Sequence, residues 1–138
     1  MKKVIITFFL VFSTIIFAQK QTEKIKFFDI QQNAKLKGNG YQLVLKEVVS
    51  DSRCPQGVTC IWAGEVQFVV SVYKDKKLVE NETITLAPNQ GPDYKEWFSK
   101  YLPKCKKNVK SIGILPYPKE GNPINTKEYF LRIGYVKK

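Results

Sequence analysis

Apolar and polar residues alternate with a period of two over much of this chain, and helical periodicity is almost absent. Successive side chains of a β-strand point to opposite faces, so this alternation is typical of strands that bury one face. In residues 65–73, one face is entirely apolar and consists of Val66, Phe68, Val70 and Val72. The pattern predicts strands at residues 25–30, 41–49, 65–73, 78–86, 109–117 and 128–136.

Turn-forming residues separate these segments. Glycine, proline, asparagine, aspartate and lysine cluster at residues 37–40, 74–77, 88–93 and 118–123. Short strands at such spacing are typical of antiparallel β-proteins. We therefore predict an all-β fold, namely a single antiparallel β-sandwich (Ig-like or related) of about six or seven strands with one short helix.

The predicted helix lies in residues 93–102, where the alternation with a period of two gives way to helical spacing. Its aromatic side chains recur at spacings of three and four, as on one face of a helix: Tyr94, Trp97, Phe98 and Tyr101. Pro92 precedes the segment and Pro103 follows it, which is consistent with a helix confined between them. We expect this helix to cover apolar side chains at one open end of the sandwich.

The first residues have the pattern of a secretory signal peptide. Lysines precede an apolar run that ends at Phe17, and Ala18 is a small residue at which a signal peptidase would cut. A transmembrane anchor is the alternative, but a bilayer requires about 20 apolar residues and this run is shorter. We predict a signal peptide at residues 1–18 and one β-sandwich domain at residues 19–138, in a periplasmic or extracellular protein.

The chain is strongly basic, with a formal net charge of +11 at pH 7. Its only arginines are Arg53 and Arg132, so the planar guanidinium group that binds guanine and phosphate with two hydrogen bonds is nearly absent. Together with export, this composition argues against a nucleic-acid partner. A candidate basic patch consists of Lys104, Lys106, Lys107 and Lys110. The lysines serve either to attach the protein to an anionic glycan or lipid surface, or to keep an exported domain soluble.

The sequence contains no histidine, which limits both catalysis and metal binding. Histidine is the usual general base and the commonest zinc ligand. The chain also lacks a G-x-S-x-G nucleophile motif and a glycine-rich phosphate loop. The candidate carboxylates for a glycosidase pair are Asp51, Glu65, Asp93 and Glu96. Because nothing in the sequence brings two of them together, we predict a protein that is not an enzyme and binds no metal or cofactor.

Cys54 and Cys60 lie in the stretch that concentrates most of the unusual residues, residues 51–65. The intervening residues include Pro55 and Gly57, which let the chain turn back to the Cα separation of about 5.5 Å that a disulfide requires. In an oxidising compartment we expect a structural disulfide, which stabilises the fold by about 2 kcal/mol. A zinc site and a catalytic dithiol are alternatives, but zinc needs more ligands and redox pairs usually have C-x-x-C spacing.

Cys105 lies among the lysines of the candidate basic patch. A positive environment favours the thiolate of an exposed cysteine, so a free, reactive thiol with a thiol-redox role is one interpretation. We favour a buried, hydrophobic cysteine at the start of the next strand. Pairing of Cys105 with Cys54 or Cys60 is a further alternative, although the spacing favours the local bridge.

Other residues of the same stretch suit either a scaffold or a ligand-binding site: Asp51, Arg53, Trp62 and Glu65. In the scaffold interpretation, which we favour, Arg53 pairs with Asp51 or Glu65 and the loop closes over the end of the sandwich. In the alternative, Arg53 and Trp62 grip a ligand.

Residues 51–65, which read D-S-R-C-P-Q-G-V-T-C-I-W-A-G-E, resemble the signature of a group of small exported bacterial proteins and lipoproteins of undetermined function. The flanking strands and the L-P-Y-P segment at residues 115–118 are also similar to that group. The resemblance implies a β-sandwich in which the two motif cysteines are bridged, and it implies no catalytic residues. This chain departs from the lipoprotein members because it has no lipid-attachment cysteine, and Cys105 lies outside the motif.

Together these features favour an exported, non-catalytic binding or interaction module of the cell envelope. Its partner would be an envelope protein or an anionic glycan or lipid surface, and we expect no membrane-spanning segment after signal cleavage. A thiol-redox protein that uses Cys105 or the Cys54/Cys60 pair, and a basic binder of anionic envelope polymers, are the alternative functions.

Overall fold

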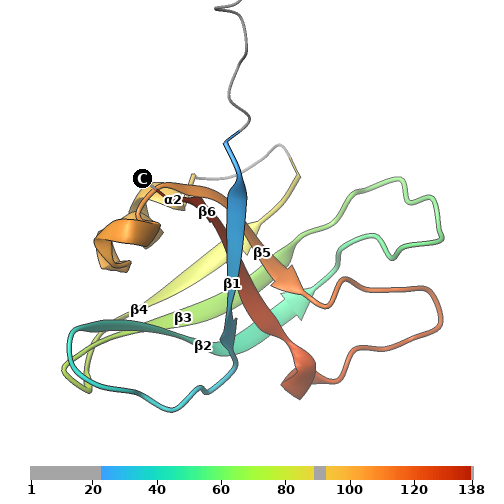
Figure 1. The fold of residues 1–138 in the computed structure, drawn as a ribbon. Helices are drawn as coiled ribbons and strands as arrows, with labels where there is room; N and C mark the ends of the chain where they lie inside the picture. Colours follow the sequence, from blue (N-terminus) through green and yellow to red (C-terminus); the bar gives the residue numbers. More distant parts are fainter. Residues whose placement is uncertain (1–22, 89–92, 138) are drawn as a thin grey trace, which may run out of the picture.

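The computed structural model describes residues 23–88 and 93–137 (Figure 1). The signal peptide predicted at residues 1–18 lies outside this part of the chain. Among the described residues, no helix is both long enough and apolar enough to cross a bilayer.

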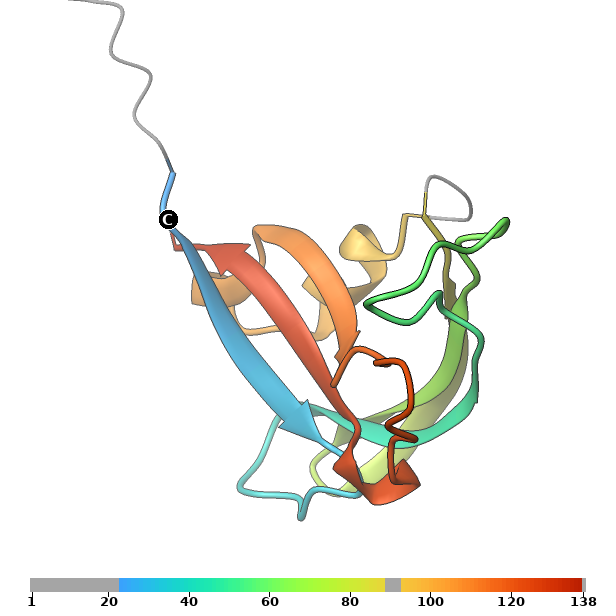
Figure 2. The same cartoon turned by 90° about the vertical axis from the view of Figure 1, so that its right-hand side faces the viewer.

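The described residues form two three-stranded antiparallel sheets, which confirms the predicted all-β fold. One sheet has the strand order β1-β6-β5 and the other the order β2-β3-β4. The strands are β1 (Ile25–Gln31), β2 (Tyr41–Asp51), β3 (Val66–Lys74), β4 (Lys77–Leu86), β5 (Val109–Leu115) and β6 (Phe130–Val136). The chain therefore begins in one sheet, forms the whole of the other as a meander, and returns to the first (Figure 2).

The period-two pattern correctly identifies the buried face of β3. Val66, Phe68, Val70 and Val72 are all buried, as predicted. Leu131 and Ile133 of β6 are fully buried in one cluster with Val66, Phe68 and Val70, so the two sheets share one hydrophobic core. The β3–β4 hairpin has the two-residue turn Asp75–Lys76, and both residues have positive φ, as a type I′ turn requires.

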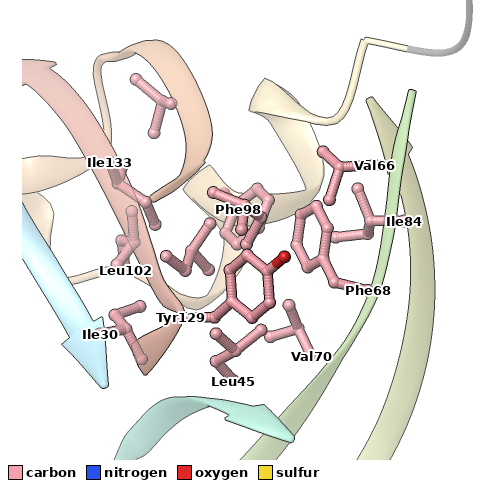
Figure 3. Packing of buried hydrophobic residues seen from close by; sticks show 13 residues of the cluster. Ile30, Leu45, Val66, Phe68, Val70, Ile84, Phe98, Leu102, Tyr129 and Ile133 are labelled. Carbon is pink, nitrogen blue, oxygen red and sulfur yellow. The ribbon is translucent and has the colours of Figure 1, made fainter. Parts of the chain in front are cut away.

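The predicted helix is also present, as α2 (Lys95–Tyr101). It contacts β5 and β2, and its Phe98 is fully buried in the core. Figure 3 shows Phe98 pointing toward Tyr129 and Phe68. Trp97 and Tyr101 both donate hydrogen bonds to one carboxylate oxygen of Glu80, at 3.1 and 2.7 Å, which attaches the helix to β4.

Short 3₁₀ turns lie in two of the connections, at η2 (Lys104–Lys106) and η3 (Thr126–Glu128). The first leads from α2 into β5, and the second precedes β6. Each turn immediately precedes a strand of the β1-β6-β5 sheet, η2 before β5 and η3 before β6. Because β5 and β6 are antiparallel, the two turns lie at opposite ends of this sheet.

Replacement of Phe98 tests the role of the helix in the core. Phe98→Ala should lower the free energy of unfolding by about 4 kcal/mol, because it removes a buried ring and leaves a cavity. Chemical denaturation measures this change. Glu96→Ala, at an exposed position of the same helix, is the matched control and should have little effect. A Phe98→Ala variant that loses no more unfolding free energy than Glu96→Ala would contradict the placement of Phe98 in the core.

Candidate functional site

The loop formed by residues 52–65 connects β2 to β3 and contains most of the candidate site residues. We call it the motif loop; Figure 1 shows it extending beyond the ends of these two strands. Its two arms are joined by backbone hydrogen bonds from Ser52 N to Glu65 O at 2.8 Å and from Cys54 N to Ala63 O at 3.0 Å. The arms approach so closely at Gly64 that an added Cβ would lie 1.9 Å from the Ser52 carbonyl oxygen. Only glycine fits at this position.

The predicted disulfide is confirmed. Cys54 and Cys60 are bonded, with their Cα atoms 5.9 Å apart. The bridge closes the outer part of the motif loop, beyond the hydrogen bonds that join its arms. The alternatives in which zinc or Cys105 binds these sulfurs do not apply to this structure.

Asp51 and Arg53 form a buried ion pair at the base of the motif loop. Arg53 donates from Nε to one carboxylate oxygen of Asp51 at 2.7 Å and from Nη2 to the other at 2.5 Å. Only 9% of the Arg53 side chain and 7% of the Asp51 side chain are exposed. The sequence predicted Asp51 or Glu65 as the partner of Arg53, and the partner in the structure is Asp51.

Arg53 also connects the motif loop to the other sheet. Nη1 donates to the carbonyl oxygen of Ile114 at 2.6 Å, and Nη2 donates to that of Pro116 at 3.1 Å. The guanidinium carbon lies 4.7 Å from the centre of the Tyr117 ring, within the range of a cation–π contact. Because Ile114 belongs to β5, Arg53 joins the end of β2 to the end of β5.

Tyr129 completes this cluster from the segment before β6. Its hydroxyl donates to Asp51 at 3.0 Å. Burial raises the pKa of Asp51, but the hydrogen bonds and charge of Arg53, together with the bond from Tyr129, hold that pKa below its ordinary value of 3.8. Burial, the hydrogen bond to Asp51 and the carboxylate charge raise the pKa of Tyr129 to about 12. Asp51 is therefore a carboxylate and Tyr129 a neutral donor at neutral pH.

A second connection attaches the motif loop to the segment that follows β5. Gln56 N donates to Pro118 O at 2.9 Å, and Glu120 N donates to Gln56 O at 3.3 Å. The loop is thus held by its own disulfide, by the Asp51–Arg53 pair and by backbone bonds to a neighbouring segment.

The outer part of the motif loop is apolar and exposed. Ile61 is 96% exposed and Trp62 is 83% exposed, and Val58 is exposed beside them. Trp62 borders a groove of about 320 Å³ between the motif loop and the end of β4, where Ala87 and Pro88 form the other wall. A second groove of about 320 Å³, lined by Arg53, by the first residue of β3, by the last residue of β4 and by β5, shares Ala87 and Pro88 with the first. The two grooves therefore adjoin at Ala87 and Pro88.

The structure separates the predicted motif residues into two groups. Asp51 and Arg53 point inward and hold the loop, whereas Trp62 and Glu65 are exposed. Sequence analysis missed Tyr129 and Ile61. Ile61 could have been found because it is an apolar residue next to the candidate Trp62. Tyr129 could not, because it lies 78 positions from Asp51 and no local pattern indicates the contact.

The prediction that Cys105 is buried is wrong. Cys105 is an exposed, free thiol in η2, before β5 begins. The buried positions on either side of this turn are Leu102 and Val109, so the turn places the intervening residues outside the core. The candidate basic patch of Lys104, Lys106, Lys107 and Lys110 lies in the same segment. It is at the β5 end opposite the motif loop.

Comparisons of the chain with models of protein families, with curated proteins and with solved structures gave no match. Within residues 23–88 and 93–137, no three cysteine, aspartate or glutamate side chains come together in a way that could hold a metal ion. Function is therefore inferred from the geometry of the loop itself.

The ion pair makes stability depend on pH. Asp51→Asn should lower the free energy of unfolding by about 3 kcal/mol at neutral pH, because it leaves Arg53 buried without its counter-charge. Since the pKa of Asp51 is lowered in the folded state, the stabilisation is present above the ordinary pKa of 3.8 and is lost as the pH falls through the lowered value. Denaturation measured from neutral pH down to below pH 3.8 should show the two proteins converging.

The matched control is Asp29→Asn, which removes the carboxylate that Arg132 contacts at 2.7 Å on the exposed sheet surface. This change should cost about 1 kcal/mol or less, because water screens the pair. The assignment of Asp51 as the stabilising group would be wrong if both variants lost the same stability at neutral pH.

Proposed function

We propose that the protein is an exported, non-catalytic binding module of the cell envelope that contacts a partner protein through the motif loop. The observation that carries this proposal is the exposure of Ile61 and Trp62, at 96% and 83%, on a loop whose base is fixed by buried contacts. Asp51 and Arg53 serve as the support, and Ile61 and Trp62 serve as the contact.

Large apolar side chains on a loop tip are the type of group that dominates protein–protein interfaces. Tryptophan is enriched among the residues that contribute most to binding, particularly where neighbouring side chains exclude water. The disulfide and the ion pair hold the motif loop in place before any partner arrives, so little conformational entropy is lost on binding. A folding role does not account for Ile61 and Trp62, because neither side chain is buried by the residues that the structure describes.

The two adjoining grooves beside the motif loop supply a place for a partner segment. The first is lined by the motif loop and by Ala87 and Pro88, and most of the lining of the second, along β5, is apolar. Glu65, exposed at the rim, offers a polar contact. An apolar centre with a polar rim is the usual composition of a binding surface.

Export is supported by the chemistry of the loop and by the start of the sequence. Disulfides persist in oxidising compartments and are rare in the reducing cytosol. The resemblance of residues 51–65 to a motif of small exported bacterial proteins points the same way. The absence of histidine from the sequence supports a role in binding rather than in acid–base catalysis.

Photo-crosslinking from the loop tip tests the proposal. A photoreactive residue at position 61 should form a covalent adduct with a defined envelope protein in intact cells. The same residue at position 78 is the control, because Leu78 is 53% exposed but lies near the β3–β4 turn, at the far end of β4 from the motif loop. The adduct should be lost when Trp62 is also replaced by alanine.

The purified partner then gives the quantitative result. Trp62→Ala should weaken binding by more than tenfold without changing the unfolding midpoint, whereas Leu78→Ala should change neither. Equal crosslinking from positions 61 and 78 would contradict the proposal. So would a Trp62→Ala variant that binds normally, or one that loses binding only because it unfolds.

A further inference from the structure

Three chain segments meet at the end of the β1-β6-β5 sheet that is opposite the motif loop. Ile25 of β1 pairs with Val136 of β6, and Val109 of β5 pairs with Tyr135. The amide of Val136 also donates to the carbonyl oxygen of Asn108 at 2.9 Å. Figure 2 shows β1 and β6 side by side, with the start of β1 next to the end of the described chain. We call this region the basic end.

Two lysines of the basic end have partners within the protein. The Lys106 ammonium lies 4.1 Å from the centre of the Phe28 ring and 5.8 Å from that of Tyr135, in a cation–π arrangement. The Lys110 ammonium lies 3.4 Å from the carboxylate of Glu23. The candidate basic patch is therefore not a uniform group of free charges.

Lys104 and Lys107 have a different environment. They line a hollow of about 230 Å³ together with Asn108 and Val136. A 3₁₀ turn has three residues per turn, so side chains at positions 104 and 107 project to the same side. Among the described residues, no carboxylate forms a salt bridge with either lysine. The hollow is thus lined by two lysines and an asparagine, and neither lysine is paired with a carboxylate of the described residues.

Further lysines lie at the same end of the sheet. The exposed lysines of the three segments, apart from Lys110, are Lys24, Lys26, Lys104, Lys107 and Lys137. Glu23 is the only acidic residue in residues 23–26, 104–110 and 136–137, and it is paired with Lys110. The basic end therefore has a local excess of positive charge that attracts anions.

Exposed apolar side chains lie on one face of the sheet at the basic end. Ile25 and Val136 are directly opposite each other, so their side chains point to the same side of the sheet. Phe27 is two positions further along β1 and shares that side. Val136 lines the hollow, whereas Ile25 and Phe27 are 43% and 58% exposed. The basic end thus combines exposed lysines, a hollow and, on the Val136 side of the sheet, exposed apolar groups.

We infer that the basic end docks on an anionic lipid bilayer, with a phosphate headgroup in the hollow between Lys104 and Lys107 and with Ile25 and Phe27 at the level of the headgroups. Lysines close to a membrane are attracted by acidic lipids, and adjacent apolar side chains add burial at the interface. The exposed apolar pair distinguishes a lipid surface from a soluble polyanion, which would require only charge. The loop and the basic end lie about 20 Å apart along β5, so both can be occupied together.

Vesicle co-sedimentation with the purified mature protein tests this inference. The probes are vesicles of phosphatidylcholine alone, vesicles that also contain phosphatidylglycerol, inorganic phosphate and polyphosphate. The protein should bind only the vesicles that contain phosphatidylglycerol, and added salt should weaken the binding. Lys104→Gln/Lys107→Gln should reduce the partition coefficient by at least about tenfold, since each lysine near the surface contributes on the order of 1 kcal/mol. Phe27→Ala should reduce it as well.

Charge-matched and site-matched controls make the result specific. Lys119→Gln/Lys127→Gln removes the same charge near the motif loop and should leave binding nearly unchanged. Trp62→Ala should also bind vesicles normally, which separates this inference from the proposed function. The inference is overturned by equal losses for the two lysine pairs, by loss of binding in Trp62→Ala, or by binding to neutral vesicles. Binding of polyphosphate or phosphate without binding of anionic vesicles would overturn it as well.

Discussion

The buried ion pair between Asp51 and Arg53 connects the two sheets at one end of the sandwich. A buried charge is costly unless its hydrogen-bonding groups are satisfied, and here the guanidinium bonds both carboxylate oxygens and the carbonyl oxygens of Ile114 and Pro116. The carboxylate also accepts from Tyr129. These partners come from β2, β5 and the segment before β6, so both charges are satisfied only when the sheets are correctly placed. The same contacts fix the base of the motif loop.

The fixed base of the motif loop gives the exposed apolar side chains at its tip a defined position. The disulfide closes the outer part of the motif loop, and the ion pair holds its base, so Ile61 and Trp62 are presented in a defined position. The opposite end of β5 carries the lysines and the hollow of the basic end. If both proposals hold, the protein keeps a partner protein close to a membrane surface, with apolar contact at the motif loop and charge attraction at the basic end.

Local sequence patterns predicted the elements well, because period-two alternation and the aromatic spacing in residues 93–102 reflect burial within one element. Cysteine spacing likewise predicted the Cys54–Cys60 bridge. The partners of Arg53 were only partly predictable. Asp51 is two positions away, whereas the Ile114 and Pro116 carbonyls are 61 and 63 positions away and, like every backbone carbonyl, have no sequence signature. Cys105 was placed wrongly because a 3₁₀ turn, rather than the strand itself, occupies its position.

Hydrogen exchange of the motif-loop amides in Arg53→Lys tests most directly whether the ion pair holds the loop. Lysine keeps the positive charge but lacks the planar guanidinium group, which bonds the carboxylate and both carbonyl oxygens at once. The amides of Ser52, Cys54 and Gln56, which are bonded in the native loop, should exchange about a hundredfold faster, as expected for a loss of about 3 kcal/mol, while the amides of β3 change much less. Unchanged protection of these three amides in a folded Arg53→Lys protein would contradict the central role of the pair.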